Sequence, residues 1–208
     1  AIVCLDAGTF AAPVYRHLPF TYPQRLMAPL SGAMGYGTPA AIASQLRRTG
    51  QRVVCLVGDG GFMMNSQEME TAVRLGLNIT VLILRDDSYG MIRWKQANMG
   101  FADWGLTYGN PDFVKYADSY GANGHRVESS AHLTELLKHC RDTPGVHLID
   151  CPVDYTENDR ILNVQIKDAD KELEAIAEQD PLCKRLMTAP GVGPVIALRF
   201  VAVVDKPE

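Results

Sequence analysis

The residues best suited to chemistry are two aspartates that each follow an apolar run. Gly58-Asp59-Gly60 comes directly after Val53–Val57, and Asp86 comes shortly after Ile79–Leu84, 27 residues beyond Asp59. Short apolar runs bounded by turn residues are typical of buried strands. The spacing therefore predicts two strand ends with one helix between them. Two carboxylates there, beside glycines whose N–H groups can approach an anion, suit a Mg²⁺ ion held against a phosphate.

The elements that must position these aspartates alternate along the chain. We expect strands at Ile2–Asp6, Val53–Val57, Ile79–Leu84, Gly124–Val127 and Val146–Cys151, and helices at Pro39–Arg48, Ser66–Leu75, Tyr89–Met99, Pro111–Tyr120 and Ala131–Arg141. This alternation predicts an α/β fold, a mostly parallel, doubly wound sheet of about six strands with helices on both faces. Right-handed crossovers would bring the strand ends near Asp6, Asp59 and Asp86 to one edge of the sheet, where such sheets bind ligands. Ser66 is expected to cap its helix.

Composition excludes some classes of protein. The formal net charge is −4, so no overall basic character indicates nucleic acid or an anionic membrane as partner. No apolar run reaches the roughly 18 residues of a membrane-spanning helix. The five scattered cysteines are interpreted as buried free thiols in a reducing cytoplasm. Because the sequence begins inside a strand-like run, we expect it to be a fragment of a longer protein.

Residues 1–163 resemble the diphosphate-binding, C-terminal domain of thiamine-diphosphate enzymes, and among these the acetolactate synthases. The matching segments are DAGTF at Asp6, APLSGAMGYGTPAAIA at Ala28, LVGDGGFMMNSQEMETAVRLGLNITVLIL at Leu56, YGMIRWKQ at Tyr89, GNPDFVKYADSYGA at Gly109 and IDCPVDYTEN at Ile149. The resemblance covers about four-fifths of the chain, and it predicts that residues 1–163 form a domain that binds thiamine diphosphate and Mg²⁺.

The same resemblance implies roles for individual residues. Asp59 and Asp86 would be Mg²⁺ ligands, with the backbone carbonyl of Ser88 as the third. Met34 would be the wedge that bends the cofactor, and Trp94 would line a pocket for a larger 2-oxo acid. Read without the family, Met34 is an ordinary core methionine and Trp94 a packed surface aromatic. The cofactor-binding residues would be Gly8, Thr9, Gly32, Ala33, Met34, Gly58, Gly60, Gly61, Tyr89, Gly90 and Met91.

The implied activity is decarboxylation and carboligation of 2-oxo acids, usually in a homo-oligomer. Two residues depart from the family, since Arg85 and Asp86 stand where many members have Asn. The family's catalytic glutamate belongs to a pyrimidine-binding domain that is not among these 208 residues. We therefore expect half a site, which is inactive alone and needs another chain or copy to supply that domain.

Residues 164–208 differ in composition and are expected to form a helical tail. They contain six Lys and Arg against eight Asp and Glu. The segment DPLCKRLMTAPGVGPVIAL at Asp180 resembles a helix-hairpin-helix of an insertion-sequence transposase family, with residues 190–194 as the hairpin. A DNA-binding module is thus the alternative function, although the net negative charge makes DNA binding weak. A non-catalytic scaffold fragment is the third possibility.

The histidines do not predict a zinc site. His125, His132 and His139 recur at intervals of seven residues. Because His125 is expected in a strand and the other two on a helix, their spacing alone does not bring three ligands to one metal ion.

Overall fold

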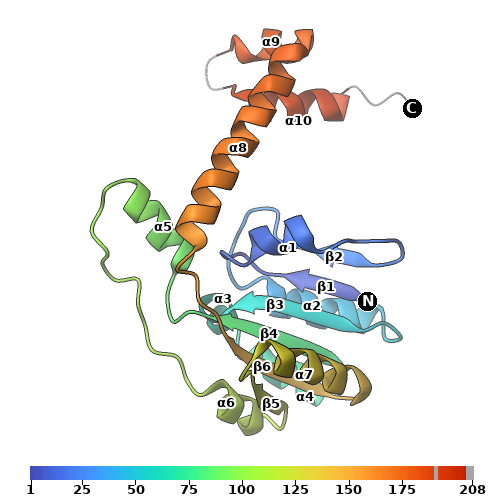
Figure 1. The fold of residues 1–208 in the computed structure, drawn as a ribbon. Helices are drawn as coiled ribbons and strands as arrows, with labels where there is room; N and C mark the ends of the chain where they lie inside the picture. Colours follow the sequence, from blue (N-terminus) through green and yellow to red (C-terminus); the bar gives the residue numbers. More distant parts are fainter. Residues whose placement is uncertain (190–191, 205–208) are drawn as a thin grey trace. The chain divides into compact units, whose positions relative to one another are not determined.

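A computed structural model describes residues 1–189 and 192–204 (Figure 1). The chain forms two compact units, Ala1–Asp154 and Tyr155–Glu208, and each has its own cluster of buried apolar residues. The expected functional boundary between residues 163 and 164 falls within helix α8 (Asn158–Gln179) and stays a prediction. Pro190 and Gly191 of the expected hairpin lie outside the described residues.

The first unit is built on one six-stranded sheet with the order β2-β1-β3-β4-β6-β5, and every neighbouring pair is parallel. The strands are β1 (Ile2–Leu5), β2 (Arg25–Met27), β3 (Val53–Gly58), β4 (Ile79–Arg85), β5 (Asn123–Arg126) and β6 (Val146–Pro152). The central strands β3, β4 and β6 are rich in Val, Ile and Leu, as strands covered on both faces are. The predicted parallel α/β sheet is confirmed.

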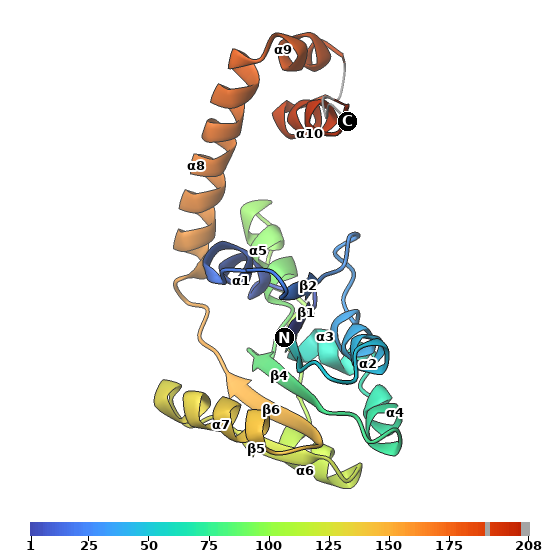
Figure 2. The same ribbon diagram turned by 90° about the vertical axis from the view of Figure 1, so that its right-hand side faces the viewer.

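Helices cover both faces of this sheet. The helices of the first unit are α1 (Ala11–His17), α2 (Gly37–Arg47), α3 (Asp59–Met64), α4 (Glu68–Arg74), α5 (Gly90–Asn98), α6 (Phe113–Ser119) and α7 (Ser130–Asp142). Figure 2 shows α7 on one side of the strands and α2 and α4 on the other. The larger core, which includes Phe62, Met69 and Phe113, lies on the face of α2, α3, α4 and α6. A smaller core on the α7 face contains Leu82 and Ile149.

Three elements differ from the sequence-based expectation. Strand β2 and helices α1 and α3 were not predicted; β2 has only three residues and no apolar alternation. Helix α3 begins at Asp59 itself, directly after β3. The expected role of Ser66 as a helix cap is wrong, because α4 begins at Glu68 with Gln67 before it and no side chain caps it. The chain turns at residues 65–67, so two helices, α3 and α4, lie between β3 and β4 where one was expected.

The sheet order places the predicted motifs at one edge. Leu5 pairs with Leu56, and Gly58 pairs with Leu84, so β1, β3 and β4 end side by side. The chain passes from β1 to β2 on one side, while β3 lies on the other side of β1. Ligands bind beyond the carboxyl ends of strands at such switch points. We call the ends of β1, β3 and β4 the carboxyl edge.

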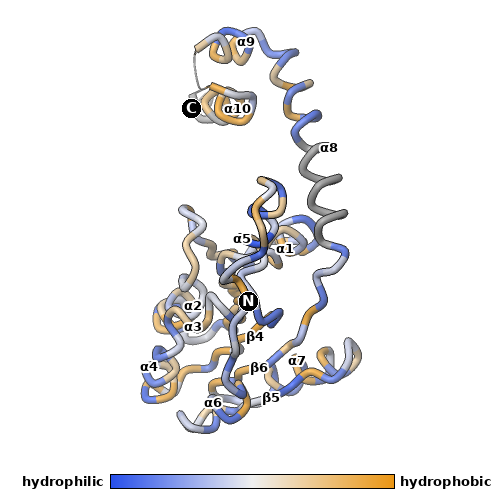
Figure 3. Tube along the Cα trace, turned by 90° about the vertical axis from the view of Figure 1, so that its left-hand side faces the viewer, coloured by the Kyte–Doolittle hydropathy of each residue, from blue (hydrophilic) through white to orange (hydrophobic). Residues whose placement is uncertain are grey.

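The second unit consists of helices α8, α9 (Pro181–Met187) and α10 (Pro194–Val204). Asp180 caps α9, because its Oδ1 accepts the N–H groups of Leu182 and Cys183 at 2.8 Å each. Among the residues whose burial is described in this unit, Ala177, Cys183 and Ala197 are buried, one from each helix. Figure 3 shows that α10 is largely apolar.

The expectations about membrane-spanning helices and about the cysteines concern the chain as a whole. In the part of the chain that is described, no helix is both long enough and apolar enough to cross a membrane. All five cysteines are buried and none forms a disulfide, as the sequence predicted.

Candidate functional site

The two predicted metal ligands meet at the carboxyl edge. Asp59 follows the last residue of β3, and Asp86 follows the last residue of β4. The backbone N–H of Asp87 donates to Asp59 Oδ2 at 2.9 Å, which ties the two strand ends together. Asp59 is 1% exposed and Asp86 is half-buried. The structure therefore brings both aspartates to one place, as the sequence led us to expect.

Asn110 is a residue of this site that the sequence did not single out. Its Nδ2 donates to Asp59 Oδ2 at 2.6 Å and to Asp87 Oδ1 at 2.8 Å. Its Oδ1 is buried and accepts no hydrogen bond from the described residues. An unpaired buried acceptor costs about 1–3 kcal/mol, and such groups call for an ion or water. No sequence spacing indicates this contact, because 51 residues separate Asn110 from Asp59.

The surroundings of Asp86 disfavour its negative charge. Ser88 Oγ donates to Asp86 Oδ2 at 3.0 Å. Burial raises the pKa of Asp86, and the negative charge of Asp59 raises it further. The Ser88 carbonyl, the third predicted ligand, accepts the hydroxyl of Tyr108 at 3.3 Å. Burial and then the charge of Asp59 raise the pKa of Tyr108, so this hydroxyl keeps its proton.

These groups fit a hard divalent cation. Two carboxylates and a backbone carbonyl are the oxygen ligands that Mg²⁺ uses. A cation would relieve the repulsion between Asp59 and Asp86 that raises the pKa of Asp86. It would also offer the unpaired Asn110 Oδ1 a positive charge nearby.

Two glycines beside the carboxylates are closely packed by side chains. A Cβ on Gly60 would lie 2.7 Å from Tyr108 Oη, 2.9 Å from Tyr89 Cε1 and 3.1 Å from Met34 Cε. A Cβ on Gly90 would lie 2.9 Å from Asp86 Oδ2 and 3.1 Å from Thr9 Oγ1. A Cβ would crowd its neighbours at either position, so only glycine fits there. We call Gly60, Gly90 and the side chains packed against them the glycine cradle.

Other predicted glycines have a different local explanation. At Gly8 and Gly58, a Cβ would run into the ring of Phe10. Packing of Phe10 against the backbone therefore explains why these two positions lack a side chain. At Gly61, the nearest atom would be Asp6 Oδ2 at 3.1 Å.

The loop at residues 32–37 is held by Asp6. This carboxylate accepts the N–H groups of Gly35 and Gly37 at 3.1 Å each. Asn65 Nδ2 donates to the Gly35 carbonyl at 2.7 Å, and Gly35 has a φ of +87°. Burial raises the pKa of Asp6, and these N–H groups partly offset the effect.

The loop carries Met34 into the site. Its Cε would lie 3.1 Å from a Cβ on Gly60, and its role as a cofactor wedge stays a prediction. Gly32 and Ala33, from the same predicted set, are exposed. The sequence placed Asp6 at the edge but gave no reason to connect it to this loop.

Helix α5 carries Trp94, the predicted pocket residue. Trp94 is half-buried, and its Nε1 is buried without a hydrogen-bond partner among the described residues. At the start of α5, the ring of Tyr89 lies 4.7 Å from that of Tyr108, measured between centroids. Arg93 pairs with Asp103 at 3.1 Å, which ties α5 to the loop that follows it.

The unusual Arg85 is engaged within the sheet. Its Nε donates to Asp150 Oδ1 at 2.9 Å, and a terminal nitrogen donates to Asp87 Oδ2 at 2.8 Å. These partners raise the pKa of Arg85, with the Asp150 hydrogen bond as the largest cause. Its charge is thus neutralised by two aspartates other than Asp59 and Asp86.

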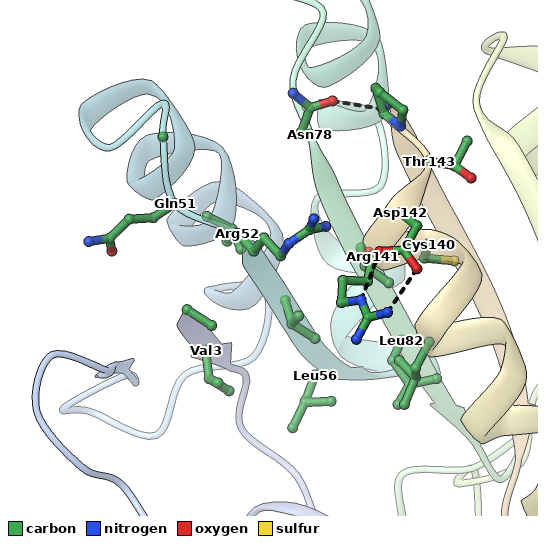
Figure 4. Close-up of a pocket in the computed structure, with 18 of the residues that line it drawn as sticks. Val3, Gln51, Arg52, Leu56, Asn78, Leu82, Cys140, Arg141, Asp142 and Thr143 are labelled. Atoms are coloured by element: carbon green, nitrogen blue, oxygen red, sulfur yellow. Dashed lines mark hydrogen bonds and ion pairs between the residues drawn. The ribbon is translucent and has the colours of Figure 1, made fainter.

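A cavity of about 660 Å³ lies elsewhere in the first unit (Figure 4). Its wall includes Val3, Arg52 and Asn78, at the opposite ends of the strands, and Cys140 of α7. The predicted site residues do not line it. The carboxyl edge, and not this cavity, is where the chemistry-bearing residues gather.

Known proteins are similar to this chain in amino-acid sequence. The acetolactate synthase of Bacillus subtilis (strain 168) is 38% identical over 159 residues, which are 75% of this chain and 28% of that protein. The acetolactate synthase large subunit of Cyanidium caldarium is 40% identical over 130 residues, or 61% of this chain and 22% of that protein. This chain thus spans less than a third of the length of the curated relatives it matches.

A solved structure shares the fold. The Rhodococcus jostii RHA1 thiamine diphosphate-dependent 4-hydroxybenzoylformate decarboxylase superimposes with a TM-score of 0.71 at 24% identity, over 76% of this chain and 30% of that one. Residues 6–151 match the family described as thiamine pyrophosphate enzyme, C-terminal TPP binding domain. With more than half of its residues in that match, the chain belongs to this family of C-terminal TPP-binding domains.

Proposed function

We propose that this chain is the diphosphate-binding domain of an acetolactate-synthase-like enzyme that uses thiamine diphosphate and Mg²⁺. The observation that carries the proposal is the meeting of Asp59 and Asp86 at adjacent strand ends, beside a cradle that only glycine allows. The relatives named acetolactate synthase support the reaction class that the sequence resemblance implied, which is decarboxylation of one 2-oxo acid and its joining to a second.

The metal would be held by three groups of this chain. Asp59 and Asp86 would each give a carboxylate oxygen, and Ser88 its backbone carbonyl. Asn110 and the Asp87 N–H keep the Asp59 carboxylate oriented through their hydrogen bonds to Oδ2. Tyr108 keeps the Ser88 carbonyl in place. These contacts are made before a ligand arrives, which lowers the cost of binding it.

The cofactor would lie in the glycine cradle. Backbone N–H groups of Gly60 and Gly61, with Gly8 and Thr9, would hold the diphosphate. Met34 would press against the cofactor, held there by the loop that Asp6 and Asn65 fix. When bound, thiamine diphosphate supplies the electron sink that decarboxylation needs. The remaining contacts are assigned to Gly32, Ala33, Gly58, Tyr89, Gly90 and Met91.

The substrate and the partner follow from the family. Trp94 would form a large, rigid wall that favours a larger 2-oxo acid. A pyrimidine-binding domain, from another copy or another chain, would supply the catalytic glutamate. We therefore expect a homo-oligomer or a complex, and no turnover of pyruvate by these 208 residues by themselves. Turnover that Asp59→Ala abolishes would contradict that last expectation.

A ligand series tests the assignment by thermal unfolding. Thiamine diphosphate and inorganic diphosphate should both raise the midpoint when Mg²⁺ is present, because the assigned contacts go to the metal and the diphosphate. Thiamine without phosphates should leave it unchanged. A ligand at 100 times its Kd stabilises by about 2.7 kcal/mol. A shift with thiamine alone, or an equal shift in EDTA, would contradict the proposed site.

A further inference from the structure

Two histidines and a cysteine converge beneath α7, away from the carboxyl edge. They are His125 of β5, His147 of β6 and Cys140 of α7. One ligand atom from each, a ring nitrogen or the sulfur, lies within 4.8 Å of the other two. Cys140 is 5% exposed and His147 is 1% exposed. Sequence spacing did not reveal this group, because His147 and Cys140 fall outside the seven-residue interval.

The fold explains why the three meet. In the ladder between β5 and β6, Asn123 pairs with His147 and His125 pairs with Ile149, so both histidines point to the same face. Helix α7 packs on that face, where Cys140 belongs to the same core as Ile149. Three separate elements thus contribute one donor each.

The hydrogen bonds of His147 determine which of its ring nitrogens can bind a metal ion. His147 Nε2 lies 3.1 Å from the Thr143 carbonyl, which can only accept, so Nε2 carries the proton. Nδ1 is then unprotonated and lies 3.1 Å from His125 Nε2. Metal-binding histidines commonly donate their other N–H to a backbone carbonyl in this way. Burial lowers the pKa of both rings, which favours the neutral form that binds metals.

The distance between the two ring nitrogens suits a tetrahedral ion. Zn–N bonds of about 2.0–2.1 Å place two nitrogen ligands about 3.3 Å apart, close to the 3.1 Å between His125 and His147. Two imidazoles and a thiolate are ligands that Zn²⁺ selects and Mg²⁺ does not. We propose that His125, Cys140 and His147 form a Zn²⁺ site that fastens α7 to β5 and β6.

The proton balance of binding is simple. The Cys140 thiol releases its proton to solvent as the sulfur–zinc bond forms, and the proton on His125 Nε2 moves to Nδ1. His147 keeps its proton on Nε2. Water takes the fourth position. Cys140 and Thr143 both line the 660 Å³ cavity, which gives the ion and the water a path to the site (Figure 4).

Cobalt reports on this site directly. Co²⁺ added to the EDTA-treated 208-residue chain should give, at one equivalent, a thiolate-to-cobalt charge-transfer band and the visible bands of tetrahedral Co²⁺. Zn²⁺ should bleach both, while excess Mg²⁺ should not. Zn²⁺ should also raise the thermal midpoint. Absence of the charge-transfer band in the folded chain would overturn the proposal.

Variants assign the band to its ligands. Cys140→Ser should abolish it, and Cys151→Ser is the matched control, because that thiol is buried in the same core but is not in the group. Asp59→Ala should keep it, which separates this site from the carboxyl edge. A band that persists in Cys140→Ser would overturn the proposal. If Cys140→Ser does not fold, His125→Gln decides, since a ligand role predicts at least tenfold weaker Co²⁺ binding and unchanged binding contradicts it.

Discussion

At the scale of single residues, Asp86 destabilises the metal-free chain. Burial and the charge of Asp59 raise its pKa above the ordinary 3.8, so the folded chain keeps this proton to a higher pH than the unfolded chain does. The free energy of unfolding therefore falls as the pH rises from 3.8 through the folded-state pKa, and the loss is complete above it.

Asp86→Asn should consequently stabilise the chain in EDTA at neutral pH and flatten this pH dependence. Urea unfolding of both chains across the acid range measures the effect. The same variant should weaken Mg²⁺ binding, because the amide carries no charge. If the Asp86→Asn chain is less stable than the unmodified chain at neutral pH in EDTA, the charge of Asp86 does not destabilise the folded chain.

Gly60 tests the cradle. Gly60→Ala would place a methyl group 2.7 Å from Tyr108 Oη and 3.1 Å from Met34 Cε. We expect thiamine diphosphate to bind at least tenfold more weakly, about 1.4 kcal/mol, with a loss of about 1–3 kcal/mol in stability from the crowding. Gly50→Ala is the control, since a Cβ there meets nothing within 4 Å. Equal cofactor affinity in both variants would mean that the ligand lies elsewhere.

At the scale of elements, the sequence predicted the parts with strong patterns. Apolar runs in the sequence located β3, β4 and β6, and the right-handed crossover rule placed Asp59 and Asp86 at one edge of the sheet. Helix α7 was predicted to within one residue at each end. These features depend on local periodicity and on topology that admits few alternatives.

Other parts depend on contacts between distant residues, which a single sequence does not show. The bond from Asn110 to Asp59 spans 51 positions, and that from Asn65 to the Gly35 carbonyl spans 30. The start of α3 at Asp59 was missed, because its glycines are poor helix formers and only tertiary packing accounts for a helix there. The convergence of His125 with His147 depends on the register of β5 against β6.

The cap of α9 gives a prediction for the second unit. Asp180→Ala removes the acceptor for two N–H groups and should lower the stability of that unit by about 1 kcal/mol. Asp180→Asn keeps a side-chain oxygen and should lose little. Urea unfolding followed by circular dichroism compares the two. Equal losses in both variants would show that the cap does not hold the helix.

At the scale of the whole molecule, the family match and the second unit occupy different parts of the chain. The match ends at residue 151, and the second unit begins at Tyr155. Residues 164–208 carry more acidic than basic side chains. The domain assignment to thiamine diphosphate binding therefore belongs to the first unit alone.

The charge of the tail predicts little or no affinity for DNA. Fluorescence anisotropy of a labelled duplex at low salt should show no saturable binding, because phosphate contacts by Lys and Arg supply most of such affinity. Salt-dependent binding that Gly193→Asp abolishes would favour the helix-hairpin-helix alternative. That variant is not expected to crowd its surroundings, since a Cβ at Gly193 meets no described atom within 4 Å.

Calorimetric titration of the 208-residue chain with thiamine diphosphate at fixed Mg²⁺ tests the central claim most directly. The unmodified chain and Glu70→Ala, which removes an exposed carboxylate paired with Arg74, should bind the cofactor equally. Asp59→Ala should not bind it, because the proposed metal ligand is removed. Equal binding by Asp59→Ala, or no binding by any of the three, would contradict a Mg²⁺·thiamine diphosphate site at the carboxyl edge.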